Sequence, residues 1–159
     1  MLIIFGGLSG VGKTTLSKLL SQKLKAVYLR IDTIEQTLSR VQNFKVDIEG
    51  YMVAAAIARE NISLGHHVII DAVNSVDIAR QMWRDISEQE GIPIFQIEVI
   101  CSNKSEHRRR VETRYPDIQG HILPTWSDID NQNFELWRDS DLVLDTHNDD
   151  AKNGVDIII

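Results

Sequence analysis

Short apolar runs alternate with longer amphipathic segments along this chain. The apolar runs that predict strands are Leu2–Phe5, Val27–Leu29, Val68–Ile70, Ile94–Ile100 and Leu142–Leu144. Most of the segments between them repeat apolar residues every three or four positions, which is typical of a helix that packs by one face. Alternating strands and helices favour a parallel sheet covered by helices. The pattern therefore predicts the α/β class.

The helical segments have recognisable ends. After the first run, leucines at helical spacing predict a helix that packs on the sheet: Leu16, Leu19, Leu20 and Leu24. Two helices are expected between the second and third runs, near Thr33–Val41 and Tyr51–Leu64, with Gly65 as the cap of the second. A further helix, Val76–Gln89, is expected to open at a Ser75 cap and to end at Gly91.

The C-terminal segment changes character within a few residues. It is polar from Asp145 to Asn153 and then apolar from Val155 to Ile159. An apolar end does not favour exposure to water. We therefore expect this end to pack as a last element, unless the polypeptide is shorter than the gene product.

A phosphate-binding motif stands between the first run and the first helix. Residues Gly7 to Thr14 fit G-x-x-x-x-G-K-[ST], whose glycines let backbone N–H groups turn toward phosphates at a helix N-terminus. Lys13 is expected to reach the β and γ oxygens, and the Thr14 hydroxyl to ligate Mg²⁺. The residues predicted to hold the nucleotide are Gly7, Leu8, Ser9, Gly10, Val11, Gly12, Lys13, Thr14 and Thr15. A glycine-rich turn that binds nothing would have no use for the lysine.

Two aspartates follow predicted strands. Asp32 comes just past the second apolar run, and Asp71 closes the third. The carboxyl ends of parallel strands meet at one rim, which is also where the phosphate loop lies. There Asp32 is predicted to accept a hydroxyl proton or to orient the attacking oxygen, and Asp71 to hold Mg²⁺ through water. The structural alternatives are a helix cap in which Asp32 forms a capping box with Glu35, and a solvated strand end at Asp71.

An arginine-rich helix is predicted over residues 104–115, after the fourth run. Arg110 and Arg114 are four residues apart, so they share a helix face. Guanidinium groups carried by a closing lid, about residues 104–128, stabilise the charge of a transferring phosphoryl group and exclude water. The sequence therefore predicts that these two arginines close over the γ-phosphate.

The alternative for this helix is a solvated charged surface. Glu106 and Glu112 lie at distances that allow pairing with the arginines. Arg108 and Arg109 are weaker lid candidates than the other two arginines.

Length, charge and cysteine content narrow the class of protein. The 159 residues allow one domain, 1–159, with a single core. The net charge of −6 argues against a broad basic face for nucleic acid. Cys101 has no partner for an internal disulfide and is expected to be a small buried hydrophobe. No signal segment or apolar stretch of membrane-spanning length appears, so a cytoplasmic location is expected.

Two further features of the sequence bear on the class of protein. The run Asn103–Glu106 stands where GTPases carry Asn-Lys-x-Asp, but its acid is Glu, and the segment after Asp71 lacks the switch glycine, which disfavours a GTPase. Trp83 and Trp137 are expected in the core or between helices. Trp126 follows the arginine-rich helix and has the alternative of stacking on a substrate.

These residues together resemble the phosphate-loop kinases of small molecules, the group that holds adenylylsulfate kinase, gluconate kinase, chloramphenicol phosphotransferase and the zeta-toxin-like enzymes. The match covers the phosphate loop, Asp32, Val68–Asp71 with Ala72, and the pair Arg110 and Arg114. The resemblance implies a three-layer P-loop NTPase fold with a five-stranded parallel sheet in the order 2-3-1-4-5. It also implies ATP with Mg²⁺ and transfer to a hydroxyl or phosphate acceptor.

The same resemblance says something about the C-terminal third. The segment Leu142–Thr146 resembles the last strand, which leads to the loop that lines adenine. The group normally has a closing helix after this strand, which this chain is expected to lack or barely begin.

The predicted function is transfer of the γ-phosphate of ATP to a hydroxyl of a small molecule. The predicted catalytic residues are Lys13, Asp32, Arg110 and Arg114, and the predicted metal ligands are Thr14 and Asp71. Two alternatives remain: a kinase of nucleic-acid 5′-hydroxyls, which needs a basic channel leading to the acid, and an ATP-binding regulatory module that transfers nothing. The acceptor and the oligomeric state are left open.

The acceptor pocket is expected between residues 33 and 64. The side chains predicted to form its wall are Tyr51, Met52, Ala54, Ala55 and Ala56. The same side chains fit a place in the core equally well.

Overall fold

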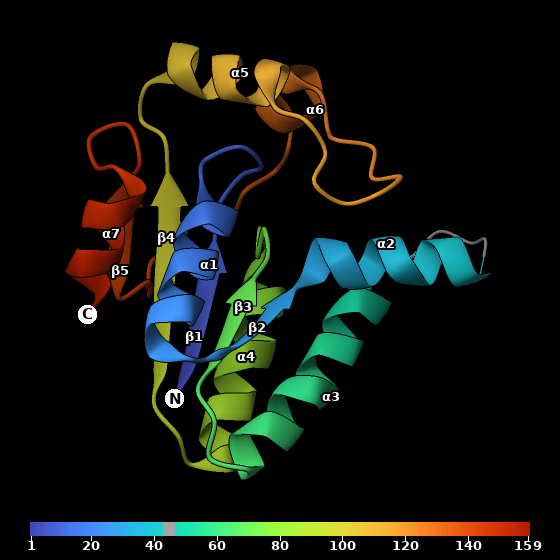
Figure 1. The fold of residues 1–159 in the computed structure, drawn as a ribbon, viewed down its shortest axis with the longest axis vertical. Coiled ribbons are helices and arrows are strands. Elements are labelled where there is room, and N and C mark those ends of the chain that lie inside the picture. Colours follow the sequence, from blue (N-terminus) through green and yellow to red (C-terminus); the bar gives the residue numbers. More distant parts are fainter. Residues whose placement is uncertain (43–46) are drawn as a thin grey trace.

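The computed structural model describes residues 1–42 and 47–159. Its centre is a parallel sheet in the order β2-β3-β1-β4-β5, which confirms the expected order. The strands are β1 (Leu2–Gly6), β2 (Val27–Arg30), β3 (Val68–Asp71), β4 (Ile94–Ile100) and β5 (Leu142–Asp145). Helices cover both faces, so the molecule has three layers (Figure 1).

The central strand β1 shows why its sequence is a continuous apolar run. All of its residues are buried, and the side chains alternate between two cores. Leu2 and Ile4 point into one core, whereas Ile3 and Phe5 point into the other. A strand covered on both faces has no solvent side, so it lacks the apolar-polar alternation of a half-exposed strand. Each such side chain contributes about 1.5–3 kcal/mol by its burial.

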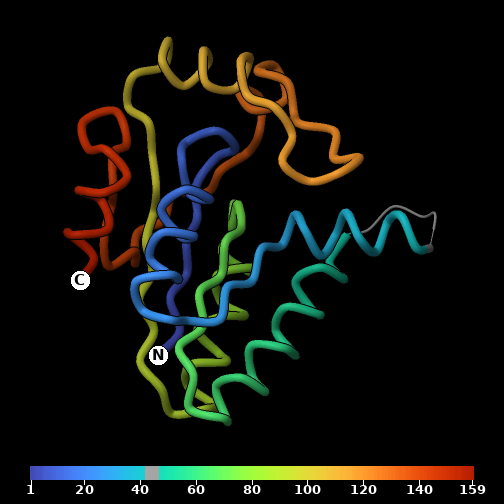
Figure 2. Tube along the Cα trace, in the orientation of Figure 1, coloured from blue at the N-terminus to red at the C-terminus, as the bar shows by residue number. Residues whose placement is uncertain are grey.

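The helices divide between the two faces and the upper rim. One core contains residues of α1 (Lys13–Leu24) and α7 (Ala151–Ile158), and the other contains residues of α3 (Glu49–Ser63) and α4 (Asp77–Glu90). The remaining helices are α2 (Ile31–Gln42), which contacts α3, and α5 (Lys104–Thr113) and α6 (Trp126–Asp130). The last two lie above the carboxyl ends of the strands, and the trace between them arches over this rim (Figures 1 and 2).

Several helix ends differ from the sequence expectation. Helix α2 begins at Ile31, so Asp32 lies within its first turn. The expected cap at Ser75 is wrong, because the N-cap of α4 is Val76 and carries no side-chain cap. The Ser75 carbonyl instead accepts hydrogen bonds from Glu135 N and Arg80 Nη2. Gly91 ends α4 in the left-handed region, with φ of +62°, as expected.

The C-terminal segment closes the fold. The expectation that the closing helix is lacking or barely begun is corrected by α7, which has eight residues. Its cap Asp150 accepts a hydrogen bond from Asn153 N at 2.8 Å. Gly154 lies against α1, where a Cβ would come within 2.7 Å of Leu16 Cδ2. The apolar end therefore packs as a last element.

Trp83 and Trp137 are buried in the core that contains residues of α3 and α4, as expected. Trp83 is fully buried and donates from Nε1 to Asn74 Oδ1 at 3.1 Å. Trp137 is buried under Arg80, whose guanidinium carbon lies 4.8 Å from the centroid of the Trp137 ring.

Cys101 is only partly buried, although a buried position was expected. In the described part of the chain, no helix combines the length and the apolar character needed to cross a membrane.

Candidate active site

A cleft of about 500 Å³ opens at the carboxyl ends of the central strands, between the phosphate loop and the α5–α6 segment. It brings together residues that the sequence spreads over more than one hundred positions. The predicted site residues on its wall are Ser9, Gly10, Gly12, Lys13, Thr14, Thr15, Asp32, Asp71, Arg110 and Arg114. Gly7, Leu8 and Val11 do not line it: Val11 belongs to the core, and Gly7 packs against β4.

The backbone of the phosphate loop requires its glycines. Gly7, Gly10 and Gly12 have φ of +137°, +86° and +105°, a region that disfavours any side chain. A Cβ on Gly7 would lie 2.1 Å from the Val99 carbonyl oxygen. Lys13 is only 8% exposed, and its Nζ donates to the Leu8 carbonyl at 2.8 Å. Burial lowers the pKa of Lys13, and the nearby carboxylates Asp71 and Asp32 oppose that shift.

Asp71 is a buried acid held by a neighbouring strand. Its side chain lies at the end of β3, and the residue is only 3% exposed. The Tyr28 hydroxyl of β2 donates to its Oδ2 at 2.6 Å. Burial, together with the Asp71 charge, raises the pKa of Tyr28, so the hydroxyl keeps its proton. A solvated strand end does not fit this environment.

The oxygens beside the loop suit a hard cation. The Thr14 hydroxyl and the Asp71 carboxylate line the same cleft, and Mg²⁺ is bound by one or two such oxygens together with substrate phosphates. Among the residues that the structure describes, no three His, Cys, Asp or Glu side chains gather into a complete metal site. The donor set therefore fits Mg²⁺ that arrives with a nucleotide.

Asp32 lines the cleft, and it lies within the first turn of α2 and does not form the capping box that was its structural alternative. Its Oδ2 lies 3.6 Å from Arg30 Nη2. Glu35 packs against α3, where a Cβ on Gly50 would lie 2.3 Å from Glu35 Cγ. Burial, reinforced by three neighbouring carboxylates, raises the pKa of Glu35 to about 7. Asp32 is therefore available to a ligand.

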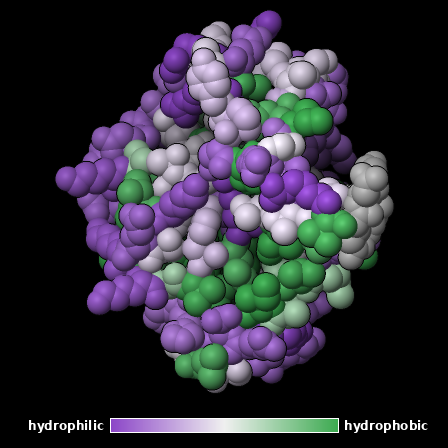
Figure 3. Space-filling model, turned by 45° about the vertical axis from the view of Figure 1, so that its right-hand side comes forward, coloured by the Kyte–Doolittle hydropathy of each residue, from purple (hydrophilic) through white to green (hydrophobic). Residues whose placement is uncertain are grey.

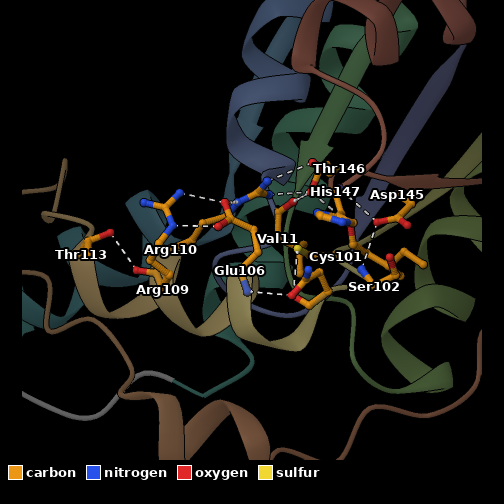
Figure 4. A network of polar contacts seen from close by, with 12 residues as sticks. Val11, Cys101, Ser102, Glu106, Arg109, Arg110, Thr113, Asp145, Thr146 and His147 are labelled. Carbon is orange, nitrogen blue, oxygen red and sulfur yellow. Dashed lines mark hydrogen bonds and ion pairs between the residues drawn. The ribbon is translucent and has the colours of Figure 1, made fainter.

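The two predicted lid arginines reach different parts of the site. Arg110 donates to Glu106 from Nε, and to Thr146 Oγ1 and O from its two Nη atoms at 2.8 and 3.0 Å (Figure 4). Thr146 Oγ1 in turn donates to the Val11 carbonyl at 2.7 Å. Arg110 thus connects α5 to the loop after β5. Helix α5 ends at Thr113, so Arg114 is its C-cap and does not continue the helix face.

Arg114 points back to the phosphate loop. Its Nη1 donates to Ser9 Oγ at 3.0 Å, and its Nη2 donates to the Pro124 carbonyl at 3.4 Å. Burial lowers the pKa of Arg114, and the Asp32 charge opposes that shift. Of the two arginines, Arg114 is the one placed beside the phosphate-binding backbone.

The other two arginines of α5 follow the solvated-helix interpretation. Arg108 pairs with Glu112 at 2.7 Å, and Arg109 pairs with Glu106 at 2.7 Å. Both arginines are exposed, and such pairs contribute little stability.

His107 is a site residue that the sequence reasoning missed. Its Nε2 lies 2.8 Å from the Ser9 carbonyl oxygen, and its ring meets Trp126 edge-on at 5.2 Å. Trp126 therefore packs beneath α5 and is not on the wall of the cleft. His107 and Val111 are four residues apart and share a helix face, which was the sequence signal that α5 packs by this face.

Arg30 and Asp117 were also missed. Arg30 Nη1 donates to Asp117 Oδ2 at 2.7 Å, and both residues line the cleft. An arginine two positions before the candidate catalytic acid Asp32 was the signal for Arg30. Asp117 is 87 positions away along the chain, so only the fold brings it there.

Asn103 and buried residues of the expected acceptor wall have structural roles. Asn103 caps α5 by accepting from Glu106 N, which explains its place without guanine. The expected acceptor wall on α3 does not line the cleft, because Ala54 and Ala55 are in the core. Met52, on α3, is exposed. Hydrophobic residues gather on one part of the molecular surface, in the lower half of the view in Figure 3.

Comparison with known proteins gives the family. Residues 2–133 match the model of a family described as AAA domain. The chain is 30% identical over 156 residues to the probable adenylyl-sulfate kinase of Aeropyrum pernix, covering 94% of this chain and 85% of that protein.

Two solved structures share the fold. The crystal structure of APE1195 superposes with a TM-score of 0.75 at 26% identity, over 99% of this chain and 91% of that one. The Mycobacterium tuberculosis APS kinase CysC, in complex with AMPPNP and APS, has a TM-score of 0.67 at 18% identity, over 99% and 94% of the two chains. With its phosphate loop, sheet order and kinase relative, the chain belongs to this AAA-domain family and is a P-loop kinase.

Proposed function

We propose that this protein transfers the γ-phosphate of ATP, in the presence of Mg²⁺, to a hydroxyl group of a small molecule. The observation that carries the proposal is the cleft itself, which Lys13, Asp32 and Arg114 line together. The similarity to a relative described as a probable adenylyl-sulfate kinase supports a small-molecule acceptor. A solved neighbour that holds AMPPNP supports an adenine nucleotide.

Each residue has a role that follows from its position. The loop amides and Lys13 hold the β and γ phosphates, and Arg114 adds positive charge beside Ser9. Thr14 and Asp71 would hold Mg²⁺, which neutralises charge on the transferring group when bound. Asp32 accepts the proton of the acceptor hydroxyl or orients its oxygen. Arg110 organises the wall of the nucleotide site through Thr146.

The test is ADP release over a panel of sugars, nucleosides, antibiotics and cofactor precursors, with hydrolysis in the absence of acceptor as background. Asp32→Asn is expected to lose about 10²- to 10⁴-fold in kcat, because a positioned base contributes that much, while it keeps its affinity for AMPPNP. Normal transfer by Asp32→Asn would show that the base assignment is wrong.

The same panel separates the alternatives. Short 5′-hydroxyl oligonucleotides as acceptors test the nucleic-acid kinase. Bound ATP without ADP release from any acceptor would favour the regulatory module.

A further inference from the structure

Three charged side chains from distant parts of the chain meet at the Asp32 end of the cleft. Asp117 Oδ2, in the loop between α5 and α6, accepts from Arg30 Nη1 at 2.7 Å and from Lys18 Nζ at 3.1 Å. Arg30 is the last residue of β2, and Lys18 lies on α1. One lid carboxylate oxygen is therefore the shared counter-ion of two cations.

The basic side chains at this meeting point have more hydrogen-bond donors than the surrounding protein has acceptors for them. The Arg30 side chain is only 10% exposed, and a guanidinium with so little water needs an anionic partner. Its Nε and that of Arg114 are buried without a hydrogen-bond partner among the described residues, as is His121 Nδ1. All three residues line the cleft. The wall thus offers more hydrogen-bonding groups than Asp117 satisfies.

The Asp117 carboxylate can be replaced by another anion at little cost. The Asp117 side chain is 48% exposed, and so is much of Lys18. Exposed ion pairs contribute little to stability, because water competes for both partners. A phosphate, sulfate or carboxylate oxygen can accept from Arg30 as the Asp117 oxygen does, and such a group can also offer a second oxygen to the guanidinium.

We propose that the acceptor carries an anionic group, a phosphate, sulfate or carboxylate, which binds Arg30 and Lys18 in the place that Asp117 occupies in this structure. The inference rests on the proposed function, because it concerns the acceptor of the same cleft. Arg30 lies 3.6 Å from Asp32, so the anionic group and the reacting hydroxyl of one small molecule fit side by side. Asp117 then acts as an internal stand-in that an anionic acceptor displaces and a neutral one does not.

Matched acceptor pairs test the charge requirement. Gluconate against glucitol, and adenylyl sulfate against adenosine, each differ by the anionic group. We expect the charged member of at least one pair to have a kcat/KM at least tenfold above its neutral counterpart. Arg30→Gln is expected to raise KM for the charged member at least tenfold, and Lys18→Gln, on an exposed part of α1, by a smaller factor.

The variant Asp117→Asn distinguishes two roles for Asp117: a carboxylate that the acceptor displaces, and a carboxylate that only holds the α5–α6 segment in place. If the acceptor replaces Asp117, the variant lowers KM for the charged member, because the competing carboxylate is gone. If Asp117 only holds the lid closed, KM rises for both members, which would overturn the proposal. Asp130→Asn is the matched control, since Asp130 forms an equivalent exposed lid pair with Lys104 at 2.6 Å, away from the cleft.

A binding experiment keeps the two proposals distinguishable. Sodium sulfate is titrated calorimetrically, at constant ionic strength, into the protein saturated with AMPPNP and Mg²⁺. We expect binding to the wild type, tighter binding to Asp117→Asn, and loss of binding in Arg30→Gln. Equal sulfate binding by wild type and Arg30→Gln would overturn the anionic acceptor. Sulfate binding of the expected pattern, without ADP release from any acceptor, would instead count against the proposed phosphotransfer.

Discussion

The polar side chains at the bottom of the cleft are positioned by neighbours that do not line it. Tyr28 fixes one oxygen of Asp71 by a 2.6 Å hydrogen bond, and Asp71 itself lines the cleft. A group that orients a metal-binding carboxylate tunes metal affinity without touching the metal.

Tyr28→Phe is therefore expected to raise the Mg²⁺ concentration for half-maximal ADP release by about tenfold. The hydroxyl is lost, and the ring that fills the space is kept. Tyr51→Phe is the matched control, because its hydroxyl accepts from Asn74 N and does not touch Asp71. Identical Mg²⁺ dependence in wild type and Tyr28→Phe would contradict the positioning role.

At the scale of elements, α5 and the phosphate loop form one unit. His107 and Arg114 both bind Ser9, one at its carbonyl and the other at its hydroxyl. Gly10 allows this approach, since a Cβ there would lie 2.6 Å from Val111 Cγ2. Helix α5 is thus docked on the loop by side chains that the loop sequence does not reveal.

The His107 contact predicts a pH dependence. Burial lowers the pKa of His107 below its ordinary value, so at acidic pH the unfolded chain binds the proton more readily than the folded one. The stability that His107 adds is present above about pH 6.5 and is lost as the pH falls through its lower folded pKa. We expect His107→Gln to cost about 1 kcal/mol at pH 7.5 and less at pH 5.5, measured by urea unfolding. His66→Gln, at an exposed histidine, is the control; a cost independent of pH would contradict the contact.

Glu35, at the contact between α2 and α3, predicts the opposite dependence of stability on pH. Burial raises the pKa of Glu35 to about 7, so the folded protein holds this proton more tightly than the unfolded chain does. Stability from this group is present at pH below about 4.5 and is lost as the pH rises through 7. Glu35→Gln is expected to raise the urea midpoint at pH 8 relative to wild type and to match it near pH 4.5. Glu60→Gln, at an exposed glutamate on α3, should change neither; a lower midpoint for Glu35→Gln at pH 8 would show that the charged carboxylate is stabilised.

For the whole molecule, periodicity and motif were sufficient to predict the strands and the rim of the site. Strands β1 and β3 are buried along their whole length, so their apolar runs are unambiguous. Asp32 follows β2 and Asp71 ends β3, and parallel topology carries both to the same edge as Lys13. The strand order came from the resemblance to a known group of kinases.

The parts that escaped prediction depend on helix ends and long-range contacts. Arg110 and Arg114 share a face only if the helix continues, and α5 ends between them. Helix α7 contains a glycine and few strong helix formers, so packing against α1 stabilises it more than propensity does. The net charge of −6 did not reveal the arginines around the cleft, because total charge says little about a local surface.

The central claim is that the phosphate loop holds a nucleotide in the cleft. It is tested most directly by calorimetric titration of AMPPNP with Mg²⁺ into the wild type, Lys13→Ala and the surface control Lys23→Ala. Lys23 lies on the same helix as Lys13 and pairs with Asp156 at 2.7 Å. We predict binding to the wild type and the control with equal Kd, and binding about 10- to 100-fold weaker in Lys13→Ala, because one charge-assisted hydrogen bond is lost. Absence of binding heat in the wild type, or an unchanged Kd in Lys13→Ala, would contradict a nucleotide held by this loop.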